Sequence, residues 1–451
     1  MSVAFAPTAL RAEAALMALR AVEAEEGALD LDQRRALLAE LRRVLLHHAQ
    51  AIAEAAAADY GARSAEDTLL ADVLLIADAC AYSRRKLRGW ARPRRVGVPF
   101  PFLPARAWVE HVPKGVIGIM APWNYPMQLA LMPAVDAIAA GNRVVIKPSE
   151  AAPRVAALIE TILAEAWGPR IARVVQGGPD VAQDFAAQPW DHLVFTGGTE
   201  IGRRVMAAAA ANLTPLTLEL GGKCPALVLP GADLKRAARD ILVAKAVNAG
   251  QTCIAPDTVL LIGHSAAEFA RAARESGVSE TGTAIINARQ QARLDALSEG
   301  ATIAWMAPGP HSIGLALAQG GLATEEIFGP ILAMEECATL DDALAWVRER
   351  PHPLAIYTFG ATSAEEARIA ANTKSGALVT ERAVEYAALP GLGFGGVGAS
   401  GFGRRNGEAG FREFSNPRAR MRNPRWAMAR LFDRPQSNFA KKLIRQLVGI
   451  K

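Results

Sequence analysis

Apolar residues in the first part of the chain recur at the spacing of an amphipathic helix. From Asp30 to about Trp90, leucines such as Leu38, Leu41 and Leu45 stand three or four positions apart, with arginines between them. Residues at this spacing share one face of a helix, so the pattern predicts a mainly helical segment.

The pattern then changes. The proline-rich stretch 98–104 predicts an irregular or edge segment, and the alternation over 107–112 predicts a strand. From Gly115 onward, short apolar runs alternate with helical patterns, which predicts a doubly wound parallel sheet of the α/β class. A second alternating block, 233–400, predicts a second α/β domain. The predicted strands are 116–120, 143–146, 192–195 and 226–229, and the predicted helices are 129–140, 156–166 and 233–247.

Length and charge narrow the class of protein. With 451 residues, 51% of them hydrophobic, the chain is long enough for two or more soluble domains. Its formal charge of +5 is small for this length, so we expect no nucleic-acid partner. Seven basic residues lie between Arg84 and Arg95. A solvated helix end explains them better than a nucleic-acid patch, because no aromatic platform accompanies them.

The cysteines and the N-terminal stretch bear on the compartment. Four scattered cysteines form no CxxC pair and no metal-ligand spacing, so we expect neither disulfides nor a bound metal, and a reducing cytoplasm. Charged residues such as Arg11 and Glu13 interrupt the N-terminal apolar stretch, unlike the core of a signal peptide. No run reaches the roughly 20 apolar residues that would span a bilayer.

Two turns of the predicted sheet are candidates for nucleotide binding. The turn 196–202 follows a predicted strand, and Gly197 and Gly198 would let backbone N–H groups approach a phosphate at a helix start. A plain tight turn is the alternative, since the spacing is not GxGxxG. Lys147 and Glu150 end another strand, where a carboxylate can accept from ribose hydroxyls. Taken alone, a charged surface turn explains this pair better.

Cys253 lies in a loop of small and polar residues, 248–256. A substrate can reach a cysteine there, whereas a lone cysteine is usually a buried small hydrophobe, the interpretation that fits Cys80 and Cys337. Glu219 stands at the end of an apolar strand. A carboxylate in such a place has either a partner or a raised pKa, and a raised pKa suits a general base.

Seven motifs together resemble those of the aldehyde dehydrogenase superfamily, in the same order and at similar spacing. The resemblance covers roughly residues 115–414. The short N-terminal part, Tyr125 and the Lys-Pro-Ser-Glu sequence resemble the shorter class, which includes fatty, aromatic and coniferyl aldehyde dehydrogenases. The motifs are Gly115–Pro126, Lys147–Glu150, Phe195–Thr199, Leu218–Lys223, Gly250–Cys253, Glu325–Pro330 and Phe394–Gly401.

The resemblance implies an NAD(P)-dependent oxidation of an aldehyde to a carboxylic acid. Cys253 would be the nucleophile, and the side-chain amide of Asn124 and the backbone N–H of Cys253 would hold the oxyanion. The thiohemiacetal would pass hydride to the nicotinamide and leave a thioester. Glu219 would then activate the water that releases the acid. An aromatic or a medium- to long-chain aliphatic aldehyde is the implied substrate.

The resemblance also assigns cofactor-binding residues. Lys147 and Glu150 would hold the adenosine ribose, with the pyrophosphate at Gly198 and Thr199. Glu326 would take the nicotinamide ribose, with Phe328 against the ring. A carboxylate near the 2′-hydroxyl disfavours a 2′-phosphate, so we expect NAD and leave NADP open. The remaining implied cofactor residues are Trp123, Ser149, Gly197, Gly202 and Leu220.

Several departures from the family pattern lie on the substrate side. The region between Leu261 and Glu325 is shorter than usual. Glu381 stands where the family usually has Asn, Tyr386 replaces a common His, and Gly393 replaces the Pro that usually precedes Phe394. The implied substrate entrance consists of Tyr125, Tyr386 and Phe394. The aldehyde is therefore left open.

The implied domains are a dinucleotide-binding domain (1–95 and 114–220), a catalytic domain (221–400), a β oligomerisation arm (96–113 and 401–425) and a basic amphipathic tail (426–451). The arm implies a homodimer. In the tail, Phe439, Leu443, Ile444 and Leu447 share one helix face after a Ser437 cap, with basic residues elsewhere. Such a helix would dock on the neighbouring subunit or make peripheral contact with a membrane surface.

Two other functions stay open. A CoA-acylating or reductive relative on the same scaffold would have to avoid hydrolysing its thioester, so Glu219 argues against it. A degenerate, binding-only homologue is the second, and the presence of Cys253, Asn124 and Glu219 argues against that one.

Overall fold

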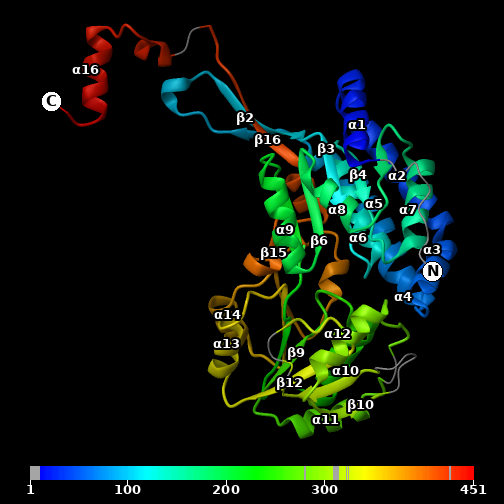
Figure 1. The fold of residues 1–451 in the computed structure, drawn as a ribbon. Helices are drawn as coiled ribbons and strands as arrows, with labels where there is room; N and C mark the ends of the chain where they lie inside the picture. The colour runs from blue at the N-terminus through cyan, green and yellow to red at the C-terminus, as the bar shows by residue number, and fades with distance from the viewer. Residues whose placement is uncertain are drawn as a thin grey trace.

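The computed structural model describes residues 11–278, 281–307, 314–320, 322, 325–425 and 428–450. Three sheets organise this part of the chain. A six-stranded sheet and a seven-stranded sheet form two domains, one above the other in Figure 1, and a three-stranded antiparallel sheet projects from the first domain as an arm. The predicted α/β fold with a small β arm is confirmed.

The six-stranded sheet has the order β15-β7-β6-β3-β4-β5. All neighbours are parallel except the edge strand β15, which runs antiparallel to β7. The chain builds β3, β4 and β5 toward one edge and then returns to place β6 and β7 on the other side of β3. The strands are β3 (Val116–Met120), β4 (Arg143–Lys147), β5 (Ala172–Val174), β6 (His192–Gly197), β7 (Leu216–Leu220) and β15 (Gly401–Phe402).

Helices cover both faces of this sheet, because its strands are apolar on both sides. Ile117 and Ile119 of β3 pack into a core with α2, α3, η1, α5, α6 and α7. Val116 and Met120 pack on the opposite face with α1, α8 and α9. The helices are α1 (Ala12–Glu26), α2 (Leu31–His47), α3 (Ala49–Tyr60), α4 (Ala65–Thr68), the π-helix η1 (Leu69–Leu74), α5 (Leu75–Trp90), α6 (Pro126–Ala140), α7 (Pro153–Ala166), α8 (Pro179–Ala187), α9 (Thr199–Ala210) and α15 (Gly407–Glu413).

The seven-stranded sheet has the order β10-β11-β12-β9-β8-β13-β14, parallel except for the edge strand β10. Its strands are β8 (Pro225–Val228), β9 (Thr258–Ile262), β10 (Thr302–Met306), β11 (Ala316–Gln319), β12 (Ile331–Cys337), β13 (Ala355–Phe359) and β14 (Ala377–Thr380). Its helices are α10 (Leu234–Ala246), α11 (Ala266–Glu275), α12 (Ala288–Ser298), α13 (Leu340–Arg348) and α14 (Ser363–Asn372), with 3-10 turns η3 (Val247–Gly250), η4 (Glu385–Ala388) and η5 (Gly398–Ser400).

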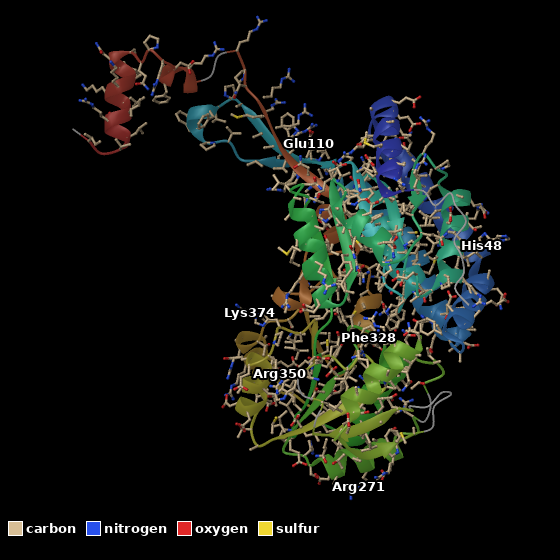
Figure 2. All side chains as sticks on the ribbon, viewed as in Figure 1. His48, Glu110, Arg271, Phe328, Arg350 and Lys374 are labelled. Carbon is tan, nitrogen blue, oxygen red and sulfur yellow. The ribbon has the colours of Figure 1, made fainter. Side chains whose placement is uncertain are left out.

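The arm pairs segments that are far apart in the sequence. Its central strand β2 (Arg106–Pro113) pairs with β1 (Arg94–Val96) and β16 (Ser415–Arg422). Glu110 of β2 forms ion pairs with Arg418 and Arg420 of β16 and is marked on the arm in Figure 2. A 3-10 turn η2 (Phe100–Phe102) closes the arm, and η6 (Met428–Phe432) leads to the terminal helix α16 (Asn438–Leu447), away from the body in Figure 1.

The predicted elements are present, with boundary differences at proline and glycine. Helices α6 and α7 each begin three residues before their predicted starts, at Pro126 and Pro153. Proline fits the first helical position because its missing N–H needs no partner there. Ser437 caps α16 by accepting from the backbone N–H of Ala440 at 3.1 Å, as predicted.

Candidate active site

Two adjoining cavities lie where the strand order of the six-stranded sheet reverses. In open α/β sheets, ligands bind at the carboxyl ends of the strands beside such a switch point. Here the switch lies between β3 and β6. The segments that follow them, Pro122–Asn124 and Gly197–Gly198, line a cavity of about 260 Å³. A larger cavity of about 1190 Å³ shares Trp123, Thr196 and Gly198 with it and extends toward β4.

Cys253 lies in the wall of the smaller cavity. Asn248 and Ala249 of the preceding turn have left-handed backbones, with φ of 51° and 53°. At Gly250, also left-handed, a Cβ atom would lie 2.1 Å from the carbonyl oxygen of Gly329, so glycine is required. Cys80, Cys224 and Cys337 are buried, whereas Cys253 is partly exposed. Desolvation by the surrounding cavity wall, with Glu326 and Glu219 nearby, raises the pKa of the Cys253 thiol to about 12.

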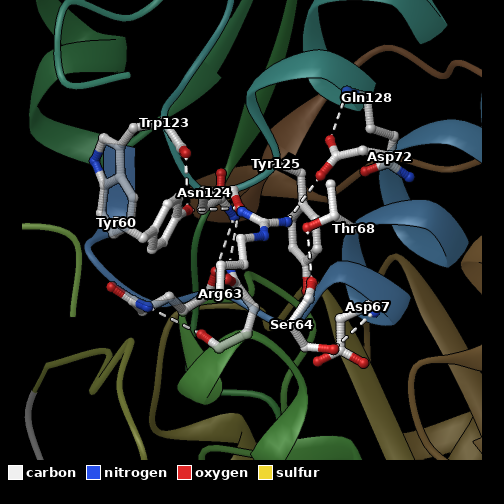
Figure 3. Close-up of polar contacts among 12 residues, drawn as sticks. Tyr60, Arg63, Ser64, Asp67, Thr68, Asp72, Trp123, Asn124, Tyr125 and Gln128 are labelled. Atoms are coloured by element: carbon white, nitrogen blue, oxygen red, sulfur yellow. Dashed lines mark hydrogen bonds and ion pairs between the residues drawn. The ribbon is translucent and has the colours of Figure 1, made fainter. Parts of the chain in front are cut away.

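Asn124 lies in the same cavity wall and is held by polar contacts from three other segments (Figure 3). Its backbone oxygen accepts from the hydroxyl of Tyr60 at 2.8 Å, from Nη1 of Arg63 at 2.9 Å and from Nδ2 of Asn248 at 2.8 Å. Its side-chain Nδ2 donates to the backbone oxygen of Gln251 at 3.1 Å. Two of these contacts tie Asn124 to the loop of Cys253, so the amide and the thiol are positioned as one unit.

Arg63 supports this unit through a buried ion pair. Its Nη2 donates to Oδ2 of Asp72 at 2.8 Å, and both side chains are 1% exposed. Asp72 also accepts from the backbone N–H of Gln128 at 2.9 Å, in the first turn of α6. Figure 3 shows Arg63 in the middle of this network, between Asn124 and Asp72. Neither Arg63 nor Asp72 carried a sequence signal, because short motifs do not reveal contacts between the segment after α3, η1 and a distant loop.

Glu219 reaches the cavity from the carboxyl end of β7. Its Oε1 accepts from Nε of Arg405 at 2.5 Å, and its Oε2 accepts from the hydroxyl of Thr196 at 3.4 Å. Burial raises the pKa of Glu219, while Arg405 and Thr196 lower it in part. The carboxylate thus has both features that the sequence presented as alternatives: a partner and a raised pKa.

The predicted cofactor residues divide between the two cavities. Lys147, Ser149 and Glu150 line the larger one, where Nζ of Lys147 lies 2.8 Å from Oε2 of Glu150. Leu220, Glu326 and Phe328 line the smaller one, and Trp123, Gly197 and Gly198 line both. Phe328, labelled between the two domains in Figure 2, meets the Trp123 ring edge to face at 5.5 Å.

Gly197, Gly198, Thr199 and Gly202 form the turn from β6 into α9. Gly198 caps the helix, and a Cβ atom there would meet nothing within 4 Å, so its backbone is open to a ligand. Thr199 begins the helix but lies outside the cavity linings. Gly202 is a packing glycine, because a Cβ atom there would lie 2.6 Å from the Leu220 side chain. An open helix start beside a cavity of this size fits a dinucleotide.

Glu326 approaches the six-stranded sheet closely. At Gly221, a Cβ atom would lie 1.8 Å from Oε2 of Glu326. Burial and the neighbouring Asp257 raise the pKa of Glu326 to about 8, while the backbone N–H of Gly222 lowers it. Gly221 therefore makes the room that this carboxyl group occupies.

Tyr125, Tyr386 and Phe394, the predicted substrate entrance, lie outside the linings of these two cavities. The Tyr125 hydroxyl is 2.7 Å from that of Thr252. Tyr386 and Phe394 stack at 5.8 Å with an interplanar angle of 12°. Their role at the entrance stays a prediction.

Sequence reasoning missed Arg405 beside Glu219, and Gln290 and Arg293 of α12, which line the smaller cavity. Arg405 stands in a Gly-Arg-Arg-Asn-Gly sequence typical of an exposed turn. Gln290 and Arg293 lie in the shortened region, where the motifs give no anchor.

Comparison with known proteins identifies the family to which the chain is similar. The model of the aldehyde dehydrogenase family matches residues 3–283 and 318–419. The chain is 40% identical over 438 residues to a probable coniferyl aldehyde dehydrogenase of Pseudomonas aeruginosa, covering 93% of this chain and 92% of that protein. It is 28% identical to the substrate-bound structure of Staphylococcus aureus AldH, with a TM-score of 0.90, covering 97% of this chain and 99% of that one.

Two further matches bear on the cofactor. One is a Canis lupus familiaris protein named dimeric NADP-preferring aldehyde dehydrogenase, 32% identical over 86% of this chain and 89% of that protein. The other is a Mycobacterium tuberculosis aldehyde dehydrogenase in complex with NAD⁺. It is 26% identical with a TM-score of 0.82, over 90% of this chain and 89% of that one.

Proposed function

This chain belongs to the aldehyde dehydrogenase family and is an enzyme that oxidises aldehydes, and from that premise we propose that Cys253 carries the reaction with a nicotinamide cofactor. The family implies such a cofactor. The observation that supports the proposal most directly is that Cys253, Asn124, Glu219, Glu326 and Phe328 line one cavity of about 260 Å³. Nucleophile, oxyanion donor, general base and cofactor-binding residues are thus within reach of one small substrate group.

In the first half of the reaction, the thiol of Cys253 gives its proton to solvent and its sulfur bonds to the aldehyde carbon. The carbonyl oxygen gains the negative charge. The Asn124 side-chain amide and the Cys253 backbone N–H are the donors that hold it, and one such donor contributes about 3–4 kcal/mol in comparable sites. Tyr60, Arg63 and Asn248 hold the backbone carbonyl of Asn124 and so fix the backbone from which that amide projects.

In the second half, Glu219 takes a proton from water, whose oxygen adds to the thioester carbon. The carbon–sulfur bond then breaks, the carboxylic acid leaves, and the sulfur of Cys253 takes up the proton that Glu219 had accepted from water. Burial raises the pKa of Glu219, which makes the carboxylate a stronger base than an exposed one.

The cofactor, when bound, accepts the hydride of the substrate. Gly197 and Gly198 would hold its pyrophosphate at the start of α9, and Lys147 and Glu150 would bind its adenosine ribose. Glu326 would bind the other ribose, with Phe328 and Trp123 beside the ring. Glu150 is exposed at the rim and disfavours a 2′-phosphate, whereas Lys147 offsets it. We therefore propose NAD as the preferred cofactor with measurable use of NADP.

The substrate that we propose is an aromatic aldehyde or a medium- to long-chain aliphatic one. The coniferyl name of the Pseudomonas aeruginosa relative supports the aromatic class. The test is an absorbance screen for NADH or NADPH across short, long-chain and aromatic aldehydes, with Cys253→Ala as control. Activity that survives Cys253→Ala would contradict the mechanism, and NAD binding without turnover of any aldehyde would favour a binding-only homologue.

Product analysis separates hydrolysis from acyl transfer to coenzyme A. Glu219 in the cavity favours hydrolysis, because an acylating enzyme must protect its thioester from water. Free acid as the sole product with coenzyme A present supports the proposal. Acyl-CoA as the main product would contradict it.

We further propose a homodimer built on the arm, with α16 in peripheral contact with an anionic membrane surface. Residues 415–451 contain ten basic residues and one acidic residue, a net of +9, whereas the whole chain carries +5. On α16 and just beyond it, Phe439, Leu447, Val448 and Ile450 are all more than 60% exposed. Within the described residues, every helix is too short or too polar to cross a bilayer. Contact would therefore be with the membrane surface.

Sedimentation with anionic liposomes at low salt tests this contact. The full chain should sediment, and a variant ending at Arg434 should stay in solution while keeping its activity. A full chain that stays in solution would contradict membrane contact and favour docking of α16 on the neighbouring subunit.

A further inference from the structure

The ion pair between Glu219 and Arg405 is the feature that the reaction outlined above leaves unused. Both residues are 3% exposed, and they are 186 positions apart in the sequence. A buried ion pair is weak evidence for stability, because desolvation of the charges opposes their attraction. Its presence beside a general base therefore invites a functional explanation.

Arg405 is fixed on several sides. Its backbone N–H and carbonyl pair with those of Phe394, both at 2.9 Å. Its guanidinium lies over the Phe394 ring, 4.5 Å from the centroid. Its Nη1 donates to Oδ1 of Asn406 at 3.2 Å. The strand just before it, β15, pairs with β7 so that Gly401 lies opposite Glu219. Glu219 lies on β7, and Arg405 follows the neighbouring strand β15 by three residues, so base and cation keep a fixed spacing.

The remaining charged and titratable groups around Glu219 are unlike Arg405. Cys253, Glu326 and Arg293 share its cavity. Tyr386 is an uncharged phenol whose pKa burial raises. Asp136 of α6 is a second buried carboxyl group, whose pKa burial raises to about 7. It accepts from the backbone N–H of Asn406 at 2.8 Å. Arg404 donates to the carbonyl of Gly395 and lies farther out. Among the described residues, Arg405 is therefore the cation that contacts the base directly. Its charge also lowers the pKa of Asp136 in part.

We propose that Arg405 is a positioning residue that holds Glu219 in place as a carboxylate and thereby sets the pH above which the acyl-enzyme is hydrolysed. Oε1 of Glu219 accepts a hydrogen bond from Nε of Arg405. Oε2 has only a long contact with Thr196, so Oε2 is the oxygen that can take a proton from water. Without the guanidinium, burial would raise the pKa of Glu219 further, so the carboxyl group would keep its proton up to a higher pH. The proposal rests on the role of Glu219 as general base.

An activated ester separates this step from the rest of the reaction. With p-nitrophenyl acetate, the Cys253 sulfur bonds to the acetyl carbon, p-nitrophenolate leaves and the thiol proton passes to solvent, without any need for the nicotinamide cofactor. Water then hydrolyses the acetyl thioester to acetate. The burst of p-nitrophenolate measures acylation, and the steady rate, when slower, measures hydrolysis.

In Arg405→Gln, we expect the burst to persist and the acid limb of the steady rate to move to higher pH by about 1–3 units, the range by which a contacting opposite charge shifts a carboxyl group. Arg405→Lys keeps the charge and should restore most of the profile. Arg412→Gln, which removes an exposed ion pair with Glu408 on the same C-terminal segment, should leave it unchanged.

Glu219→Gln distinguishes failure of this inference from failure of the proposed function. If Glu219→Gln retains the wild-type steady rate, the base assignment itself is wrong, and the inference falls with it. If Glu219→Gln abolishes hydrolysis but Arg405→Gln keeps the wild-type acid limb with a full burst, only the role of Arg405 is refuted. An Arg405→Gln protein that lacks the burst altogether would show a role in building the site rather than in setting the base, and would also overturn the proposal.

Discussion

Replacement of Arg63 by methionine tests how the oxyanion-binding segment is supported. The substitution keeps an unbranched side chain but removes the cation that faces Asp72, and both partners are 1% exposed. Breaking such a buried pair costs about 3–5 kcal/mol, because the remaining charge is left without compensation. A surface pair is worth at most about 1 kcal/mol. Arg203→Met, which removes an exposed pair with Glu200, is therefore the matched control.

The loss should depend on pH in a defined direction. Burial raises the pKa of Asp72, and Arg63 lowers it in part, so Arg63→Met raises it further. A carboxyl group whose pKa is higher in the folded than in the unfolded state stabilises the folded state at low pH. The contribution is full below the unfolded pKa of about 3.9 and is lost as the pH rises through the folded pKa. The variant should therefore lose more stability at pH 7.5 than at pH 5.

Urea unfolding followed by tryptophan fluorescence at the two pH values measures both effects. Arg63→Met combined with Asp72→Asn should recover most of the loss, because the neutral amide can still accept from Gln128. The turnover of Arg63→Met should also fall, since Asn124 loses one of the donors that hold its carbonyl. A loss below about 1 kcal/mol, or an equal loss at both pH values, would refute this account of the pair.

Other substitutions address the chemistry directly. Cys253→Ala should lower aldehyde oxidation by roughly 10³-fold or more while the affinity for NAD, measured by fluorescence titration, stays within about twofold. Gly221→Ala places a Cβ atom where Glu326 lies. Losing one hydrogen bond of about 1–3 kcal/mol there should weaken NAD binding by roughly fivefold or more. An unchanged dissociation constant would show that Glu326 does not contact the cofactor. Glu150→Gln removes the carboxylate that pairs with Lys147 and should shift the ratio of kcat/KM values toward NADP; a ratio that does not move would place the cofactor selectivity elsewhere.

The sequence by itself determined the fold class and the main chemical groups. Alternating apolar and helical patterns predicted the parallel sheet, because side-chain period reports directly which face of an element is buried. Motifs around Asn124, Glu219 and Cys253 were recognisable because each keeps its chemistry within a few consecutive residues, and the structure brings these three into one cavity.

Only the tertiary structure decided which residues contact and position these groups. Arg405 meets Glu219 across 186 positions, and Arg63 meets Asn124 across 61, through pairings of strands and helices that no local pattern encodes. The same holds for Gly221, whose missing side chain matters because Glu326, from the distant segment before β12, packs against it. Cys253 was identified from its loop and its neighbouring motifs. That the pKa of its thiol is raised beside two carboxyl groups follows only from burial, which depends on the packing of the whole chain.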